Sequence, residues 1–280
     1  MHQLRRLAAA IFIIALAVAA AGPALADMPQ NWGMGFQTAA SPVQKDIEQL
    51  HDLVLGIITV IVIFVAALLL WVSYRYSSKR NPVASQTSHN TGLEVAWTLI
   101  PVLILVVIAI PSFRLIYFQD RTLVADMTIK VTGHQWYWEY AYPDNQNINF
   151  SSRMVPEAES KLRQLQVDEA LVLPVGKNVR ILTTSADVIH SFFIPSMGVQ
   201  RYAIPGRTIE TWVRIDRPGM YYGECNQICG TMHPFMPIGL RAVPEAEFTA
   251  WVAEAKTKYA SDTVNPATNA AQLAVARVQH

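Results

Sequence analysis

Two long apolar runs dominate the pattern of hydrophobic and polar residues along this chain. Residues 53–74 and 95–113 carry no charged side chain, and each run is long enough to cross about 30 Å of hydrocarbon as a helix. We therefore predict a transmembrane hairpin over residues 53–121, with helices at about 53–74 and 95–116.

The segment between the two runs predicts the orientation of the hairpin. It contains three basic residues and no acidic residue before Glu94, namely Arg75, Lys79 and Arg80. Because positive residues accumulate in cytoplasmic loops, we place this segment in the cytoplasm and both ends of the hairpin outside it. The remainder of the chain, from about Thr122, is then exported.

A third apolar run lies at the N-terminus and has a different character. It follows the basic pair Arg5 and Arg6 and ends with the small-residue sequence ALA, which is the pattern of a secretory signal peptide over residues 1–26. A first membrane helix is the alternative interpretation. Cleavage after residue 26 leaves an exported N-terminal segment over residues 27–52, ahead of the hairpin.

From residue 122 the pattern becomes that of short strands. Stretches such as DMTIKVTGHQWYWEYAY and RTIETWVRI are rich in Val, Ile, Thr and aromatic residues, and Gly and Pro punctuate this region. Many such strands predict an antiparallel sandwich or barrel over residues 122–243. Residues 244–260 place acids first and lysines last, which predicts an amphipathic helix, and the polar, Ala-rich residues 261–280 predict a mobile tail.

Composition supports a membrane protein and excludes one class of partner. Of the 280 residues, 52% are hydrophobic and 15% are charged, which is too apolar for an ordinary soluble domain. The formal net charge is only +1, so the chain has no bulk electrostatic attraction for nucleic acid.

The two cysteines of the chain lie four residues apart in the stretch GECNQICGTMHPFMP. In an exported domain, Cys225 and Cys229 alone would favour a disulfide that closes a small loop. Their neighbours change this interpretation, because His233 and Met236 belong to the soft ligand set of a blue-copper site. His190, at the end of a strand-like run, is the candidate for the distant histidine. The second thiolate allows two sulfurs to bridge two copper ions, and the thioether favours copper over zinc.

Four stretches together resemble subunit II of the haem-copper cytochrome c oxidases. They are GHQWYWEY, DVIHSF, IPGR and the cysteine stretch with its spacing YYGEC-x3-CG-x2-H-x2-MP. The resemblance implies a two-helix hairpin followed by an all-β, cupredoxin-like (Greek-key sandwich) domain with a C-terminal helix. It also implies electron transfer from cytochrome c, through a binuclear copper centre, to haem in subunit I, where O2 is reduced to water with proton translocation.

The resemblance assigns roles to individual residues of this chain. It implies six copper ligands, namely His190, Cys225, the main-chain carbonyl of Gln227, Cys229, His233 and Met236. It makes Trp136 the residue that receives the electron, although strand alternation also predicts a buried face shared by Trp136, Trp138 and Tyr140. Glu94 matches a carboxylate at the mouth of the K proton pathway of subunit I, and it equally suits the positive end of a helix.

Two further implications concern the electron donor and a second metal. Asp144, Asp168 and Asp187 match acids that dock cytochrome c, but acids and bases nearly balance between residues 122 and 260, at fourteen and thirteen. We therefore expect the association rate of the electron donor to depend on salt less steeply than in an acid-rich relative. Gln227 stands where relatives usually carry a glutamate that binds magnesium at the subunit I interface, so an uncharged oxygen there implies a weakened magnesium site.

The resemblance also implies a location and a set of partners. The chain would lie in the bacterial inner membrane, with its N-terminus and copper domain on the periplasmic side. Its expected partners are subunit I, subunit III, membrane lipid, and cytochrome c or a related electron donor.

Three other functions share features with this sequence. A quinol oxidase subunit II lacks the copper ligands that are present here. A nitrous oxide reductase lacks such a hairpin and needs a large catalytic domain. A membrane-tethered copper-binding or copper-delivery module is the alternative from a different class, but it gives no purpose to the aromatic run or to Glu94.

Overall fold

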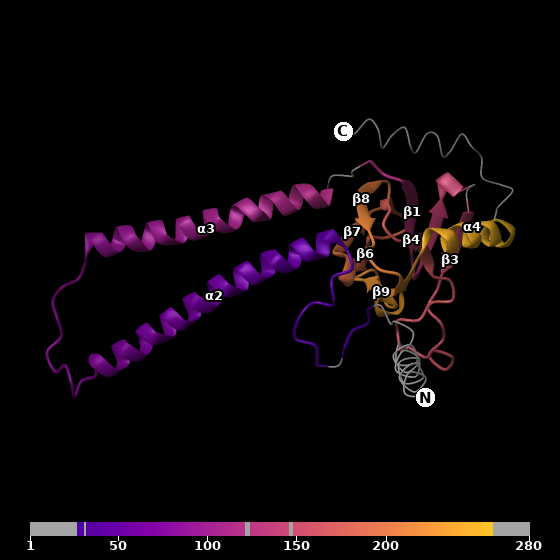
Figure 1. The fold of residues 1–280 in the computed structure, drawn as a ribbon. Coiled ribbons are helices and arrows are strands. Elements are labelled where there is room, and N and C mark those ends of the chain that lie inside the picture. Colours follow the sequence, from indigo (N-terminus) through magenta and orange to yellow (C-terminus); the bar gives the residue numbers. More distant parts are fainter. Residues whose placement is uncertain (1–26, 31, 121–123, 146–147, 260–280) are drawn as a thin grey trace, which may run out of the picture.

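The computed structural model describes residues 27–30, 32–120, 124–145 and 148–259. A long helical hairpin extends from one side of a β-sandwich domain, and helix α4 (Glu245–Tyr259) lies on the side of the domain away from the hairpin (Figure 1). The predicted signal peptide and the predicted C-terminal tail lie outside the described residues.

Helices α2 (Pro42–Arg75) and α3 (Thr91–Asp120) form the hairpin. Both are longer than the predicted spans of about 53–74 and 95–116, because hydropathy marks only the part of a helix that lies in hydrocarbon. The first turns of α2 are polar and continue directly into the apolar run. The part of the predicted exported segment from Pro42 onward is therefore helical.

Local sequence signals explain where these helices begin. The side chain of Ser41 accepts a hydrogen bond from the backbone N–H of Gln44 at 3.0 Å, and Pro42 occupies the first helical position of α2. Oδ1 of Asn90 accepts a hydrogen bond from the backbone N–H of Leu93 at 3.1 Å, just inside α3. The polar caps thus start each helix outside its apolar run.

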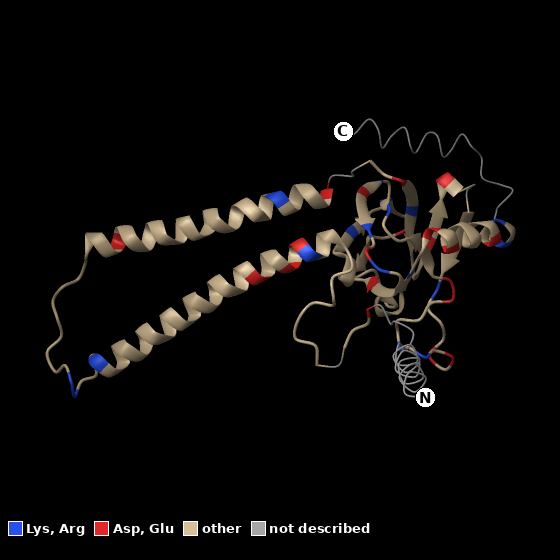
Figure 2. Ribbon diagram, viewed as in Figure 1, with Lys and Arg blue, Asp and Glu red and all other residues tan. Residues whose placement is uncertain are grey.

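Within the described residues, no other segment buries the apolar middle of the hairpin. Both helices are long and apolar enough to cross a membrane, and their most apolar windows are entirely unburied. Charged residues lie toward the ends of both helices (Figure 2). Because apolar surface is unstable in water, this distribution suits helices surrounded by lipid or by other membrane segments.

The described strands form two five-stranded sheets, with the orders β3-β2-β1-β5-β8 and β4-β10-β9-β6-β7. The strands are β1 (Met127–His134), β2 (Tyr137–Tyr142), β3 (Ile148–Ser152), β4 (Leu171–Pro174), β5 (Asn178–Ser185), β6 (His190–Ile194), β7 (Val199–Ala203), β8 (Ile209–Arg214), β9 (Gly219–Cys225) and β10 (Pro237–Val243). The predicted β-sandwich is confirmed, and most of its strand pairs are antiparallel, but the pairs β1–β5 and β4–β10 are parallel. Each parallel pair joins strands that are distant in sequence, which hairpin patterns cannot predict.

The aromatic run supplies part of the core between the sheets. Trp138, Tyr140 and Tyr142 are fully buried and alternate with less buried residues along β2. Trp136 lies in the turn before β2 and is partly buried against the core, so the buried strand face holds for Trp138 and Tyr140 but does not include Trp136. Alternation holds only within a strand, and the turn removes Trp136 from it.

The sandwich holds the outer end of α3 through side chains of β7 and β8. Nε1 of Trp212 donates to the carbonyl of Phe118 at 2.9 Å, and Nη2 of Arg201 donates to the carbonyl of Gln119 at 3.3 Å. Arg201 also pairs with Asp120. These contacts satisfy carbonyls that have no partner within the helix.

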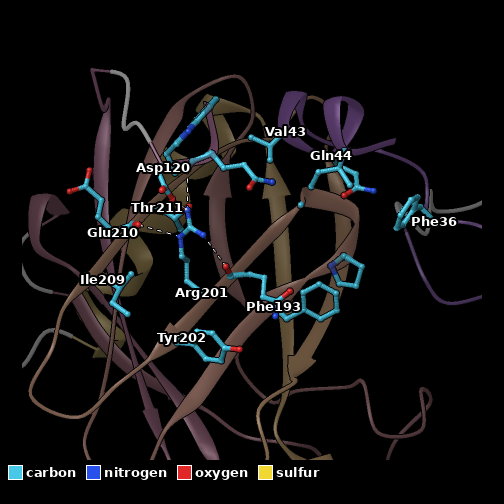
Figure 3. A pocket seen from close by; sticks show the side chains of 16 residues that line it. Phe36, Val43, Gln44, Asp120, Phe193, Arg201, Tyr202, Ile209, Glu210 and Thr211 are labelled. Carbon is cyan, nitrogen blue, oxygen red and sulfur yellow. Dashed lines mark hydrogen bonds and ion pairs between the residues drawn. The ribbon is translucent and has the colours of Figure 1, made fainter. Parts of the chain in front are cut away.

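The outer end of α2 is held in the same region. Nζ of Lys45 lies 2.5 Å from Oδ2 of Asp216, and the hydroxyl of Ser41 donates to the carbonyl of Met197 at 2.7 Å. A pocket of about 650 Å³ remains between the two helix ends and strands β7 and β8, with Arg201 on its wall (Figure 3). The sandwich is therefore attached to both helices.

Candidate metal centre

The candidate ligands come from neighbouring strands of one sheet. His190 begins β6 and Cys225 ends β9, and these strands pair with Phe192 opposite Cys225. After Cys225 the chain forms a loop that includes the short helix η3 (His233–Phe235), and it then returns as β10. This topology brings a histidine from one strand against the loop that follows another.

Two cysteine sulfurs lie at the middle of the site. The Sγ atoms of Cys225 and Cys229 are 3.9 Å apart. Nδ1 of His190 lies 3.9 Å from Sγ of Cys225, and the main-chain oxygen of Gln227 lies 3.3 Å from the same sulfur. The potential ligand atoms of His190 and both cysteines all lie within 4.8 Å of one another.

His233 and Met236 complete the cluster around the second cysteine. Nδ1 of His233 lies 3.6 Å from Sγ of Cys229, and Sδ of Met236 lies 3.7 Å from the same sulfur. Met236 is 1% exposed, whereas His233 is half-buried. The structure therefore brings together all six candidate ligand atoms that the family resemblance implies.

The separation of the sulfurs excludes a disulfide in this conformation. Cys225 and Cys229 are free and buried, and 3.9 Å is far longer than an S–S bond of about 2.05 Å. Burial, together with the neighbouring Cys225, raises the pKa of the Cys229 thiol to about 12. A bound cation would favour the thiolate instead, because metal binding releases the thiol proton. Thiolate and thioether sulfurs are soft donors that suit copper, and imidazole nitrogens also bind copper.

Asp187 orients the imidazole of His190. Its Oδ1 lies 2.8 Å from Nε2 of His190, which is fully buried. Since a carboxylate accepts, Nε2 carries the proton and Nδ1 presents its lone pair toward the sulfurs. Burial alone would raise the pKa of Asp187, but hydrogen bonds from His190, Val188 and Gln135 outweigh burial and lower that pKa.

Gln227 and Glu224 differ in their relation to the cluster. Gln227 directs its main-chain oxygen toward Cys225 and therefore needs no particular side chain for this contact. Glu224 precedes Cys225 on β9, where Cys225 is buried and Glu224 is exposed. Successive side chains of a strand point to opposite faces, so Glu224 points away from the sulfurs.

Trp136 lies directly against the loop between β9 and β10, residues 226–236, which we call the ligand loop. A Cβ atom added to Gly230 would lie 2.9 Å from a ring carbon of Trp136, which is closer than real contacts allow. Gly230 also has φ = +128°, a conformation that side chains rarely adopt. Glycine after Cys229 thus permits the indole ring to approach the cluster.

The three predicted docking acids all accept backbone hydrogen bonds, but they occupy different places. Asp187 contacts the turn that contains Trp136, and Asp168 accepts from the backbone N–H of Arg153 at 2.7 Å. The guanidinium of Arg153 lies over the ring of Tyr137, next to Trp136. Asp144 follows β2 and accepts from Thr128, so it lies at the other end of that strand from Trp136.

Glu94 lies in the first turn of α3, outside the candidate metal centre. Its backbone N–H donates to the carbonyl of Asn90 at 3.0 Å. This position suits the helix dipole, and the first turn of α3 is at the end of the hairpin away from the sandwich (Figure 1).

The fold and the site together define a membrane-anchored protein with a cupredoxin-like copper-binding domain. Two family models match this chain: "Cytochrome C oxidase subunit II, transmembrane domain" over residues 29–115 and "Cytochrome C oxidase subunit II, periplasmic domain" over residues 127–243. The chain belongs to the cytochrome c oxidase subunit II family, and it is thus a subunit of an oxidase, an enzyme complex that includes subunit I.

Individual members of the family are similar to this chain over most of their own length. A protein of Rickettsia bellii named "Probable cytochrome c oxidase subunit 2" is 46% identical over 243 residues, which cover 86% of this chain and 90% of the relative. Cytochrome c oxidase subunit 2 of Cereibacter sphaeroides is 41% identical over 264 residues, covering 86% and 87%. A crystal structure of the periplasmic domain of subunit II of cytochrome oxidase from Bradyrhizobium japonicum is 49% identical, covers 50% of this chain and 99% of that domain, and has a TM-score of 0.48.

One residue at the site received no role from the sequence. Gln135 contacts both Asp187 and the ligand loop. It lies inside the stretch GHQWYWEY, but only its contacts in the folded chain distinguish it from an ordinary surface glutamine.

Proposed function

We propose that this chain receives electrons one at a time from cytochrome c or a related donor and passes them to haem in subunit I. The observation that carries the proposal is the pair of free thiols, 3.9 Å apart, with His190, His233 and Met236 around them. When bound there, two copper ions supply a centre that stores and releases a single electron, which subunit I uses to reduce O2 with proton translocation.

The proposed ligands are His190, Cys225, Gln227 through its carbonyl, Cys229, His233 and Met236. The protein contributes rigidity to this centre. His190 is held by Asp187, and Cys225 lies at the end of a paired strand, so few groups need to move when the charge changes. Burial of the sulfurs also excludes water, and a dry site keeps the reorganisation of solvent small.

We propose Trp136 as the residue through which the electron arrives. Its indole packs against Gly230, the residue after Cys229, so it offers a short route from the surface to the ligand loop. Asp187 and Asp168, which lie at the same end of β2, would contribute to docking. Asp144 would contribute less, because it lies at the other end of that strand.

The proposed arrangement in the membrane follows from the hairpin. Residues 1–26 would be removed as a signal peptide, and the sandwich over residues 122–243 would face the periplasm from the bacterial inner membrane. The basic link after α2 supports this orientation. The backbone N–H of Asp27 donates to the carbonyl of Met220 at 3.2 Å, so cleavage after residue 26 would leave the new N-terminus on the sandwich.

Two further roles belong to contacts with other subunits. We propose that Glu94 delivers protons to the K pathway of subunit I, and that subunit III is present in the same complex. The proposed magnesium site at the subunit I interface would be weak, because Gln227 offers no charge and the exposed Glu224 points away from the sulfurs.

The experiment that tests this function follows the order of electron transfer. The purified oxidase complex is mixed anaerobically with reduced cytochrome c, and the copper and haem absorption bands are recorded in a stopped-flow instrument. We expect the copper band to bleach before the haem is reduced. Reduction of haem while the copper band persists would contradict the proposal.

A further inference from the structure

Gln135 connects two parts of the candidate metal centre that are far apart in sequence. Its backbone N–H donates to Oδ2 of Asp187 at 2.6 Å. Its side-chain Nε2 donates to the main-chain oxygen of Cys229 at 2.8 Å. The other carboxylate oxygen of Asp187 accepts from Nε2 of His190. Gln135 is therefore hydrogen-bonded directly to Cys229 and, through Asp187, to His190.

We propose that Gln135 is a positioning residue that fixes the Cys229 side of the ligand loop relative to His190. This inference rests on the proposed function, because it concerns the copper centre. The loop after Cys225 is not itself a strand. Gln135 lies in the turn between β1 and β2, which belong to the sheet opposite that of β9. A hydrogen bond across the two sheets therefore restrains a segment that strand pairing does not.

The same contact sets the distance between Trp136 and the loop. Gln135 donates a hydrogen bond to Cys229. The residues that directly follow these two, Trp136 and Gly230, pack against each other. A Cβ atom on Gly230 would lie 3.1 Å from Nε2 of Gln135 and 2.9 Å from the ring of Trp136. Loss of the Gln135 bond would therefore loosen both the ligand loop and the proposed electron route.

A simpler role for Gln135 makes a different prediction. The residue is exposed next to Trp136, and it could serve only as a surface contact for the electron donor. In that case its replacement would raise KM for cytochrome c and leave the copper centre as it was. A positioning role changes the copper centre itself, with or without the donor.

The test compares variants in the full chain, assembled in the oxidase complex. Gln135→Leu removes the donor atom and leaves the backbone bond to Asp187, whereas Gln135→Lys retains an N–H donor on a flexible side chain. Gln200→Leu, at an exposed position on β7, is the matched control. For each variant, the measurements are the copper EPR spectrum, the rate of copper loss to a chelator, and kcat and KM with cytochrome c.

We expect Gln135→Leu to lose copper about tenfold faster than the parent chain, with altered copper hyperfine splitting and a lower kcat at nearly unchanged KM. Gln135→Lys should restore most of the copper retention, and Gln200→Leu should behave as the parent chain. An unchanged spectrum and copper-loss rate in Gln135→Leu, with any effect confined to KM, would overturn the inference. Absence of a copper spectrum in the parent chain would instead overturn the proposed function.

Discussion

Nε2 of His190 and Oδ1 of Asp187 lie 2.8 Å apart, and this contact turns the other imidazole nitrogen toward the sulfur of Cys225. The two oxygens of Asp187 together accept from His190, Val188 and Gln135. An acidic side chain to which the family resemblance gives a role in donor docking therefore also orients a proposed metal ligand.

The first prediction concerns Asp187→Asn. Three N–H groups donate hydrogen bonds to the two carboxylate oxygens of Asp187. An asparagine has only one acceptor oxygen, so at least one of these donors would face the NH2 group and lose its hydrogen bond. We expect copper affinity to fall by about tenfold, measured by competition with a chelator, and the copper spectrum to change.

Asp168→Asn is the matched control, because Asp168 also accepts from the backbone near Tyr137 but contacts no ligand residue. It should leave the copper spectrum intact. If both variants raise KM for cytochrome c equally and neither alters the spectrum, Asp187 acts only in docking.

The second prediction concerns Trp136→Phe. A smaller ring loses part of the contact with Gly230, and the proposed route for the electron becomes longer. We expect electron transfer from cytochrome c to slow by at least about tenfold, which corresponds to about 1.4 kcal/mol of activation free energy. The copper spectrum should stay as in the parent chain.

Trp251→Phe provides the control for this measurement. Trp251 lies on α4 and packs against Tyr142 and Phe150, away from the ligand loop. It should transfer electrons at the parent rate. Normal turnover of the Trp136 variant with cytochrome c would remove that residue from the electron route.

The third prediction concerns the proposed magnesium site near Gln227. Manganese replaces magnesium in cells grown with manganese and is visible by EPR. We expect the parent chain to hold manganese more weakly than Gln227→Glu, because a carboxylate adds charge to a hard-cation site. Copper content should be equal in the two proteins, since the copper contact uses the main chain. Equal manganese affinity in the two proteins would show that the uncharged side chain does not weaken metal binding.

The fourth prediction separates two roles of Glu94. If this carboxylate delivers protons, Glu94→Ala should slow the proton-coupled reduction of the haem site in rapid-kinetic measurements. If it only complements the dipole of α3, the same variant should reduce the stability of the complex and leave turnover unchanged. Thr91→Ala, at the start of the same helix, controls for general damage to α3.

Much of the site could be predicted because its ligands are concentrated in one stretch. Cys225, Cys229, His233 and Met236 identify soft-metal chemistry through residue type and spacing alone. His190 was harder, since it lies 35 residues before Cys225 and reaches it only through the pairing of β6 with β9. Its assignment depended on the family resemblance as well as on the strand-like run.

Other features depend on tertiary contacts that leave no local signal. The role of Gln135 rests on a hydrogen bond to a carbonyl 94 residues away. The parallel pairs of strands and the capping of α3 by Trp212 likewise join distant segments. Hydropathy located both membrane helices, but their ends are determined by caps and by contacts with the sandwich, which is why the predicted spans were too short.

The central claim is that Cys225 and Cys229, with His190, His233 and Met236, would hold two copper ions that share one unpaired electron. EPR spectroscopy of the oxidised, purified oxidase complex tests it most directly, with near-infrared absorption recorded on the same sample. We predict a seven-line, mixed-valence copper pattern together with a near-infrared band. A four-line pattern from a single copper ion, or labile Cu(I) without an EPR signal, would contradict the account.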